Sequence, residues 1–144
     1  MSDSNSEAAI RQIVEARADA VRRGDADAMT ADVADDATIF DVIVPLRRRG
    51  KSASRSRASE WVALFDGAIG WESRDIEVFA DSDVAWCHSL SHVTGTQSGN
   101  KIDMWFRTTL GLQRRGGSWQ IVHEHSSSPF DPETGQAALD LKPS

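Results

Sequence analysis

The stretch VAWCHSLSHVTGTQSGNKIDMWFRTTLGLQR, residues 84–114, decides the fold of this chain. It holds two long runs rich in β-branched and aromatic residues, separated by Ser98-Gly99-Asn100, which is typical of a hairpin turn. In the second run apolar and polar side chains alternate with the period of a strand. The stretch therefore predicts two antiparallel strands, over 84–97 and 101–114.

Further strands are expected on both sides of this hairpin. Residues 71–80 and 118–127 have the same character, and the short segments Asp-Ser-Asp and Arg-Gly-Gly connect them to it. An apolar run at 37–44 predicts one more strand, earlier in the chain. The last four strands are expected to be antiparallel neighbours.

The first part of the chain has helical patterns. Residues 4–23 keep apolar side chains at helical spacing, with a capping box that starts at Ser4 and with Gly24 as the left-handed C-cap. A short second helix is expected after Asp25, which caps it, and a third helix over 56–67.

A basic segment, residues 45–57, is expected to form a loop opened by Pro45. It carries six of the 16 basic residues, so 10 basic residues face 22 acidic ones in the rest of the chain. This positive segment is either a lid over an anionic ligand or a solvated loop against an acidic surface, and the second interpretation agrees better with the usual behaviour of charge runs.

The order helix, helix, strand, helix and four strands predicts an α+β fold. We expect a cone-shaped barrel in which N-terminal helices pack on a strongly curved, mostly antiparallel sheet. The open end of such a cone suits a ligand. With 144 residues the chain fits a single domain over 1–144, with loosely ordered tails at 1–5 and 131–144.

The composition narrows the class of protein. A net charge of −6 argues against nucleic-acid binding, because contacts to phosphates dominate that affinity. No apolar run approaches ~18 residues, so no membrane span is expected, and no signal peptide is visible. The single cysteine, Cys87, fits a small buried hydrophobe in a reducing compartment. We therefore expect a cytoplasmic location.

The histidines His123 and His125 are the first candidates for chemistry, because imidazole titrates near neutral pH. In a regular strand they share a face with Trp119 and Ile121, unless a bulge intervenes. They are either acid–base groups or structural groups near a sheet end or a subunit interface. The two lie ~7 Å apart, but no Cys/His spacing supplies a third ligand, and no metal is expected.

Three charged residues complete the candidate catalytic set. Arg107 either grips a carboxylate or enolate or pairs with a nearby acid, since a lone buried charge is costly. Asp41 lies in an apolar run, where burial would make it a usable base. Asp103 is similar but lies nearer the turn, so we expect it to be more exposed. Which face of the strand over 101–114 lines a cavity stays open.

The segments GDADAMTADVADDATIF, DMWFR and HEHSSSPFD, at 24–40, 103–107 and 123–131, resemble SnoaL-like and ketosteroid isomerase-like proteins of the nuclear transport factor 2-like superfamily. The resemblance covers nearly the whole chain. It implies the cone-shaped fold, a pocket for a small hydrophobic molecule and a homodimer formed through the sheet. Because this fold hosts many functions, it does not fix an activity.

The resemblance also implies Asp–His acid–base pairs, which Asp41 or Asp103 can form with His123 or His125. The tyrosine-containing oxyanion hole of ketosteroid isomerase cannot form, because the chain has no tyrosine. No phosphate, haem or flavin motif is visible, so no cofactor is expected. Expected pocket residues are Phe40, Trp61, Phe65, His88, Trp105 and Ser127.

Two functions fit these observations. One is a cofactor-independent isomerase or cyclase that acts by acid–base chemistry on a small hydrophobic carbonyl compound. The other is a non-catalytic homodimer that binds a ligand or serves as an association module. An enzyme requires a base and a charge-stabilising group that converge on one cavity, whereas a binding module does not.

Overall fold

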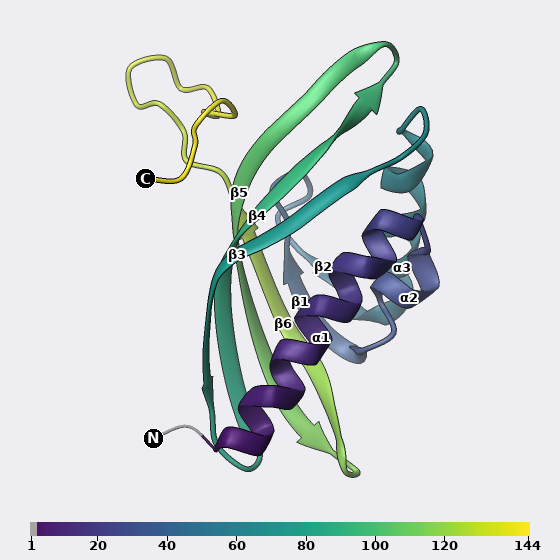
Figure 1. Ribbon diagram of the computed structural model, residues 1–144, viewed down its shortest axis with the longest axis vertical. Helices are drawn as coiled ribbons and strands as arrows, with labels where there is room; N and C mark the ends of the chain where they lie inside the picture. Colours follow the sequence, from purple (N-terminus) through teal and green to yellow (C-terminus); the bar gives the residue numbers. More distant parts are fainter. Residues whose placement is uncertain (1–2) are drawn as a thin grey trace.

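The computed structural model describes residues 3–144 and has helices in the first half of the chain and long strands in the second (Figure 1). The elements in chain order are α1 (Ser4–Arg23), α2 (Ala26–Met29), β1 (Val33–Phe40), β2 (Arg48–Arg49), α3 (Gly50–Ala63), β3 (Gly70–Ala80), β4 (Val84–Gln97), β5 (Asn100–Arg115) and β6 (Ser118–Ser127).

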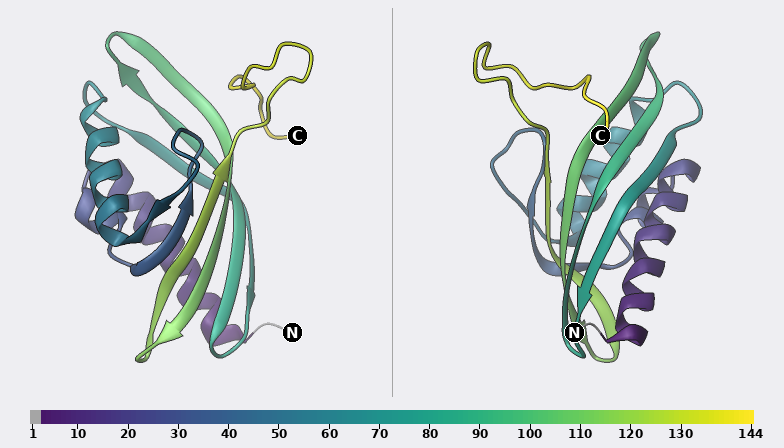
Figure 2. Two further views of the ribbon diagram at one scale, coloured as in Figure 1. Left: turned by 180° about the vertical axis from the view of Figure 1, so that it is seen from behind. Right: turned by 60° about the vertical axis from the view of Figure 1, so that its left-hand side comes forward.

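The strands form one six-stranded sheet in the order β2-β1-β6-β5-β4-β3. All neighbours are antiparallel except β1 and β6, which run parallel. The sheet is strongly curled but not closed, and the helices lie on its concave side (Figures 1 and 2). Helix α1 packs against β3, and α3 packs against β1. The predicted α+β fold, with helices on a curved and mostly antiparallel sheet, is confirmed.

The helix caps follow the sequence with one correction. The cap of α1 is Asp3, whose carboxylate accepts hydrogen bonds from the backbone N–H groups of Asn5 and Ser6, so the capping box predicted at Ser4 is wrong. Gly24 ends α1 with a left-handed φ of 63°, as predicted. Asp25 caps α2 by accepting from the N–H of Ala28.

The basic segment is not a continuous loop, which corrects the prediction. Residues 48–49 form β2, and α3 begins at Gly50 rather than at Ser56. Gly50 has a φ of +86°, and a Cβ at this position would lie 2.6 Å from the carbonyl oxygen of Asp35. Only glycine lets the chain turn from β2 into α3 this close to β1. The first turns of α3 lack an apolar stripe, so the sequence did not reveal them as helical.

The strands agree closely with the sequence, except for the first. The bounds of β4 and β6 match the predicted ones, whereas β1 covers Val33–Phe40 instead of 37–44. Val33 and Ala34 are buried and extend this strand toward its start. The segment 131–144 is mostly irregular, with an isolated bridge between Phe130 and Ala137. Of the tail expected at 1–5, residues 1–2 lie outside the described part, and residues 4–5 are helical.

The core consists of two clusters, one at each end of the curled sheet. The larger cluster joins Ile10 and Val14 of α1 to buried residues of the sheet such as Leu112 and Ile121. The second is centred on Val21, Ile69 and Val93, and many of its members are only partly buried because they border a cavity. No helix within residues 3–144 has both the length and the apolar character needed to cross a bilayer.

Candidate functional site

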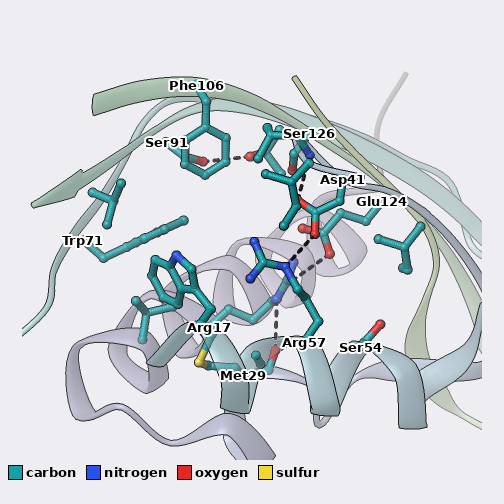
Figure 3. A pocket seen from close by; sticks show the side chains of 18 of the residues that line it. Arg17, Met29, Asp41, Ser54, Arg57, Trp71, Ser91, Phe106, Glu124 and Ser126 are labelled. Atoms are coloured by element: carbon teal, nitrogen blue, oxygen red, sulfur yellow. Dashed lines mark hydrogen bonds and ion pairs between the residues drawn. The ribbon is translucent and has the colours of Figure 1, made fainter. Parts of the chain in front are cut away.

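A cavity of about 610 Å³ lies between the helices and the concave face of the sheet. Its wall comes from one face each of α1 and α3, from the inner side of the six strands, and from residues 41–43 after β1. Met29 of α2 and, from the C-terminal segment, Ala137 and Leu139 complete it. Most lining side chains are apolar, but Figure 3 shows two arginines and two carboxylates that meet among them. This combination is typical of small-molecule sites.

The apolar face of β5 is the one that lines the cavity, which answers the question left open by the sequence. Ile102, Met104 and Phe106 point inward, whereas Asp103, Trp105 and Arg107 of the alternating polar line are not among the lining residues. Antiparallel strands commonly bury their apolar face in this way. The polar line therefore lies on the outer, convex face of the sheet.

A β-bulge in β6 determines which polar residues enter the cavity. On β5, Gly111 pairs with His123 and Leu112 pairs with Ile121, so Val122 has no partner of its own. The extra residue reverses the alternation of the strand. Trp119 and Ile121 are buried before the bulge, but His123 and His125 lie on the outer face after it.

Because of this reversal, Glu124, Ser126 and Ser128 line the cavity. The shared face of Trp119, Ile121, His123 and His125 that a regular strand would give is therefore wrong beyond Ile121. The sequence already raised a bulge as the exception, but its position follows only from the pairing with β5 and β1.

Asp41 is held at the cavity wall by two arginines. Its Oδ2 accepts hydrogen bonds from Arg48 Nη1 at 2.7 Å and Arg57 Nε at 3.1 Å, and its Oδ1 accepts from the N–H of Val42 at 2.7 Å. The side chains of the three charged residues are only 16–20% exposed. Asp41 follows the inward-facing Ile39 by two residues, and β2 pairs Arg48 with Ile39. The local sheet register thus brings the carboxylate and Arg48 together.

Arg57 reaches the same carboxylate from α3. It shares one helix face with Ser54, Ala58 and Trp61, all of which line the cavity at spacings of three or four residues. In Figure 3 its guanidinium lies between Asp41 and the side of the cavity that holds Trp71. Both arginines come from the basic segment 45–57, for which the sequence offered either a lid over an anionic ligand or a solvated loop.

A second ion pair lies on the helix side of the cavity. Arg17 Nη2 of α1 donates to Glu124 Oε1 at 2.9 Å, and Arg17 Nε donates to the carbonyl oxygen of Met29 at 3.3 Å. Arg17 lies between Val14 and Val21 on the face of α1 that is otherwise apolar and buried. A charged residue in such an apolar stripe is the sequence signal that marks Arg17.

Aromatic side chains form much of the cavity wall away from the charged residues. The rings of Trp61 and Phe65 meet edge to face with centroids 4.8 Å apart, Trp61 and Trp71 at 6.2 Å, and Trp71 and Phe106 at 5.6 Å. This chain of four rings provides a large apolar surface with little conformational freedom. It suits a ligand with a flat hydrophobic body.

Hydroxyl groups complete the lining. Ser91 and Thr108 hydrogen bond to each other across β4 and β5 at 2.8 Å. The Oγ atoms of Ser54 and Ser128 are buried and have no hydrogen-bond partner among residues 3–144. Buried hydroxyls without a partner are uncommon, because their desolvation is not compensated. These two groups are available to a ligand.

Of the five candidate catalytic residues, only Asp41 lies at the cavity. Arg107 Nε donates to Ser127 Oγ at 3.1 Å on the outer face. His123 Nδ1 is 2.7 Å from the carbonyl oxygen of Thr38, and the rings of His123 and His125 pack edge to face around Phe40. None of these outer residues lines the cavity at which Asp41 lies. Their catalytic role stays a prediction.

Asp103 is exposed, as expected from its place near the turn, with 54% of its side chain accessible. Its Oδ1 lies 2.7 Å from His92 Nε2, and this hydrogen bond, with the charge of Lys142, lowers the pKa of the Asp103 carboxyl. The ring of His92 stacks on Trp105 with centroids 4.2 Å apart. These residues form an outer-face group remote from the cavity lining.

The expected pocket residues divide in the same way. Trp61 and Phe65 line the cavity, whereas Phe40, His88, Trp105 and Ser127 are not among its lining residues. Cys87 is 3% exposed, and burial raises the pKa of its thiol to about 11. Such a thiol is a poor nucleophile, in agreement with its expected role as a small buried hydrophobe.

Comparisons with known proteins support the same fold. A family model described as the SnoaL-like domain matches residues 10–131. An NTF2-like protein of unknown function from Pseudomonas putida is 35% identical, with a TM-score of 0.90, and the match covers 99% of this chain and 100% of that one. A search of curated proteins gave no match.

Two more distant structures agree in fold. A ketosteroid isomerase-like protein from Erwinia carotovora is 23% identical, with a TM-score of 0.71 over 85% of this chain and 96% of that one. An NTF2-like protein with a cystatin-like fold from Novosphingobium aromaticivorans is 18% identical, with a TM-score of 0.72 over 84% of this chain and 80% of that one. The chain belongs to the SnoaL-like family of NTF2-like proteins.

Proposed function

We propose that the protein binds a small hydrophobic carbonyl compound in the cavity and acts on it by cofactor-independent acid–base chemistry. The reaction class is isomerisation, cyclisation or dehydration. The observation that carries the proposal is the meeting of a carboxylate, Asp41, with two guanidiniums, Arg48 and Arg57, at the wall of a mostly apolar cavity. A base and a charge-stabilising group thus converge on one site.

In this mechanism Asp41 removes a proton from the carbon next to the carbonyl group. The electron pair of the broken C–H bond moves to the carbonyl oxygen and forms an enolate. The positive charge of Arg48 and Arg57 stabilises this oxygen, and it acts strongly because the apolar walls limit screening by water. Asp41 then returns the proton to the same carbon or to a conjugated one, which completes an isomerisation.

The other two reactions begin with the same enolate. Attack of its carbon on a second carbonyl group gives cyclisation, and loss of a β-hydroxyl group as water gives dehydration. Either needs a group that delivers a proton to the departing or newly formed oxygen. Asp41, which holds the proton taken from the carbon, delivers it to this oxygen, so both reactions balance without a further acid.

Proton exchange tests the proposal without knowledge of the natural substrate. The probe is 2-tetralone, a small hydrophobic ketone. We expect the protein to accelerate the exchange of the hydrogens next to its carbonyl group for deuterium in D₂O, and ¹H NMR measures the rate of this exchange. Asp41→Asn should remove at least nine-tenths of this acceleration, since general-base catalysis typically contributes about 10²–10⁴-fold. Asp36→Asn is the matched control, because Asp36 also pairs with an arginine, Arg115, but lies on the exposed side of β1.

The result also separates the two functions that the sequence left open. Exchange that depends on Asp41 supports an enzyme. If 2-tetralone binds but exchanges no faster than in buffer, the chain is a ligand-binding module of the same fold. If exchange is accelerated equally by the wild type and Asp41→Asn, Asp41 is not the base.

We also propose that two copies pair through the outer face of the sheet. This face exposes the stacked rings of Phe79 and Trp86, whose centroids are 4.4 Å apart. It carries both cations, such as Arg74, and anions, such as Glu77. A two-fold axis brings each side chain of one copy against a different one of the other, so a face of mixed charge can complement itself.

A further inference from the structure

The charges of the cavity indicate what kind of ligand it takes. Three guanidiniums, those of Arg17, Arg48 and Arg57, line it against the two carboxylates of Asp41 and Glu124. Arg48 and Arg57 share the single carboxylate of Asp41, so the charged lining residues carry a net charge of +1. A charge held away from water is costly unless an anion pairs with it.

Arg57 is the guanidinium with free donors. Its Nε donates to Asp41, but its two terminal nitrogens have no hydrogen-bond partner among residues 3–144. Arg17 and Arg48, by contrast, each donate from two nitrogens to groups of the protein. In Figure 3 the terminal nitrogens of Arg57 point into the cavity, away from Asp41 and toward the side of Trp71. The free edge of the guanidinium is a two-pronged donor that matches a carboxylate.

Two hydroxyls of the cavity lining also lack a partner. The buried Oγ atoms of Ser54 and Ser128 have no partner in the described chain, and both residues line the cavity. Ser54 precedes Arg57 by three residues on α3, so the two side chains lie on one helix face. A ligand oxygen would give these hydroxyls the acceptor that they lack.

We infer that the ligand is a small hydrophobic carboxylate. Its carboxylate pairs with the free edge of Arg57, and its flat body lies on the edge-to-face rings of Trp61, Phe65, Trp71 and Phe106. The inference rests on the proposed function and narrows the substrate to carbonyl compounds that also bear a carboxylate. Arg57 then places the carbon between these groups beside Asp41, to which it is itself hydrogen bonded.

The test uses two probes that differ by one charge. These are 2-naphthoate and 2-naphthamide, which share the same flat ring system, and calorimetric titration gives the affinity of each. We expect the wild type to bind 2-naphthoate about ten- to a hundredfold more tightly than 2-naphthamide, as a charged hydrogen-bonding pair provides. Added salt should reduce this preference.

Variants of α3 assign the preference to Arg57. Arg57→Met should bind both probes about equally, and Arg57→Lys, which keeps the charge but loses the two-pronged edge, should retain part of the preference. Arg55→Met is the matched control, because Arg55 lies on the same helix but pairs with Asp27 on the surface. Circular dichroism verifies that each variant is folded.

Each remaining outcome overturns the inference in a distinguishable way. If 2-naphthamide binds as tightly as 2-naphthoate, the cavity takes neutral ligands, and the proposed acid–base function still stands. If the preference survives in Arg57→Met, another group holds the anion. If neither probe binds and 2-tetralone also fails to bind, the proposed function falls together with the inference.

Discussion

At the scale of single residues, Cys87 shows how burial couples the fold to pH. Its thiol is 3% exposed on β4, and desolvation raises its pKa from 9.0 to about 11. A thiol whose pKa is raised on folding stabilises the folded state fully below pH 9. This contribution is lost as the pH rises through 11, because the unfolded chain ionises first. The chain has no tyrosine that would titrate in the same range.

We predict that the free energy of unfolding of the wild type falls between pH 8 and pH 10 by about 1 kcal/mol more than that of Cys87→Ala. Urea unfolding with a reductant present, followed by tryptophan fluorescence at both pH values, measures the difference. The comparison of slopes removes the constant cost of the smaller side chain. Equal losses in the two proteins would show that the thiol is not desolvated as described.

At the scale of elements, the junction between β2 and α3 sets the position of Arg57. Gly50 turns the chain there with a φ of +86°, directly against the backbone of Asp35. The helix thus starts at a fixed point of β1, the strand that leads into Asp41. A change at this junction should therefore affect the ion-paired group as well as the local backbone.

We predict that Gly50→Ala lowers the free energy of unfolding by about 3 kcal/mol, because the new methyl group adds a steric clash to a strained φ. Gly67→Ala is the control: its φ is +106°, but nothing lies within 4 Å of the added atom. It should cost about 1 kcal/mol, the backbone strain alone. Chemical denaturation of both variants tests this order, and equal costs would contradict the role of the Asp35 contact.

The elements also explain which parts of the fold and of the site could be predicted from the sequence. Alternation and turn residues predicted β3 to β6 to within one residue, since these signals are local. The start of α3 was missed because it depends on the contact of Gly50 with Asp35, which are distant in the sequence. In the cavity, Asp41 was found as a charge in an apolar run. Glu124 was not, because the bulge at Val122 is visible only from the pairing of three strands.

At the scale of the whole molecule, the two faces of the sheet carry different kinds of side chains. The concave face holds the cavity, and the convex face holds all four histidines of the chain among exposed rings and ion pairs, such as His88 with Glu77. Side chains that the sequence suggested for chemistry thus gather where a second copy would pack. Fold-level resemblance could predict both surfaces but could not assign residues to them.

We predict that the purified protein has twice the chain mass of 15.8 kDa and that Trp86→Lys shifts it toward the monomer. Trp86 is 46% exposed in the single chain, and a lysine there would bring two like charges into the paired face. Light scattering after size-exclusion chromatography gives both masses. Val44→Lys, which changes an apolar residue that is 84% exposed in the loop after β1, is the control. A wild-type monomer at micromolar concentration would refute the pairing.

The unpaired Val122 has a consequence for how new activities arise in such a chain. Gain or loss of one residue in β6 would turn the side chains beyond that point to the opposite face of the sheet. The β6 residues that now line the cavity would then face outward, and their neighbours would face the cavity, while the order of the strands stays the same. A single codon inserted or deleted thus changes several side chains of the site at once, whereas a substitution changes one. Length variation within a strand, and not only in loops, is then a route by which one scaffold diversifies.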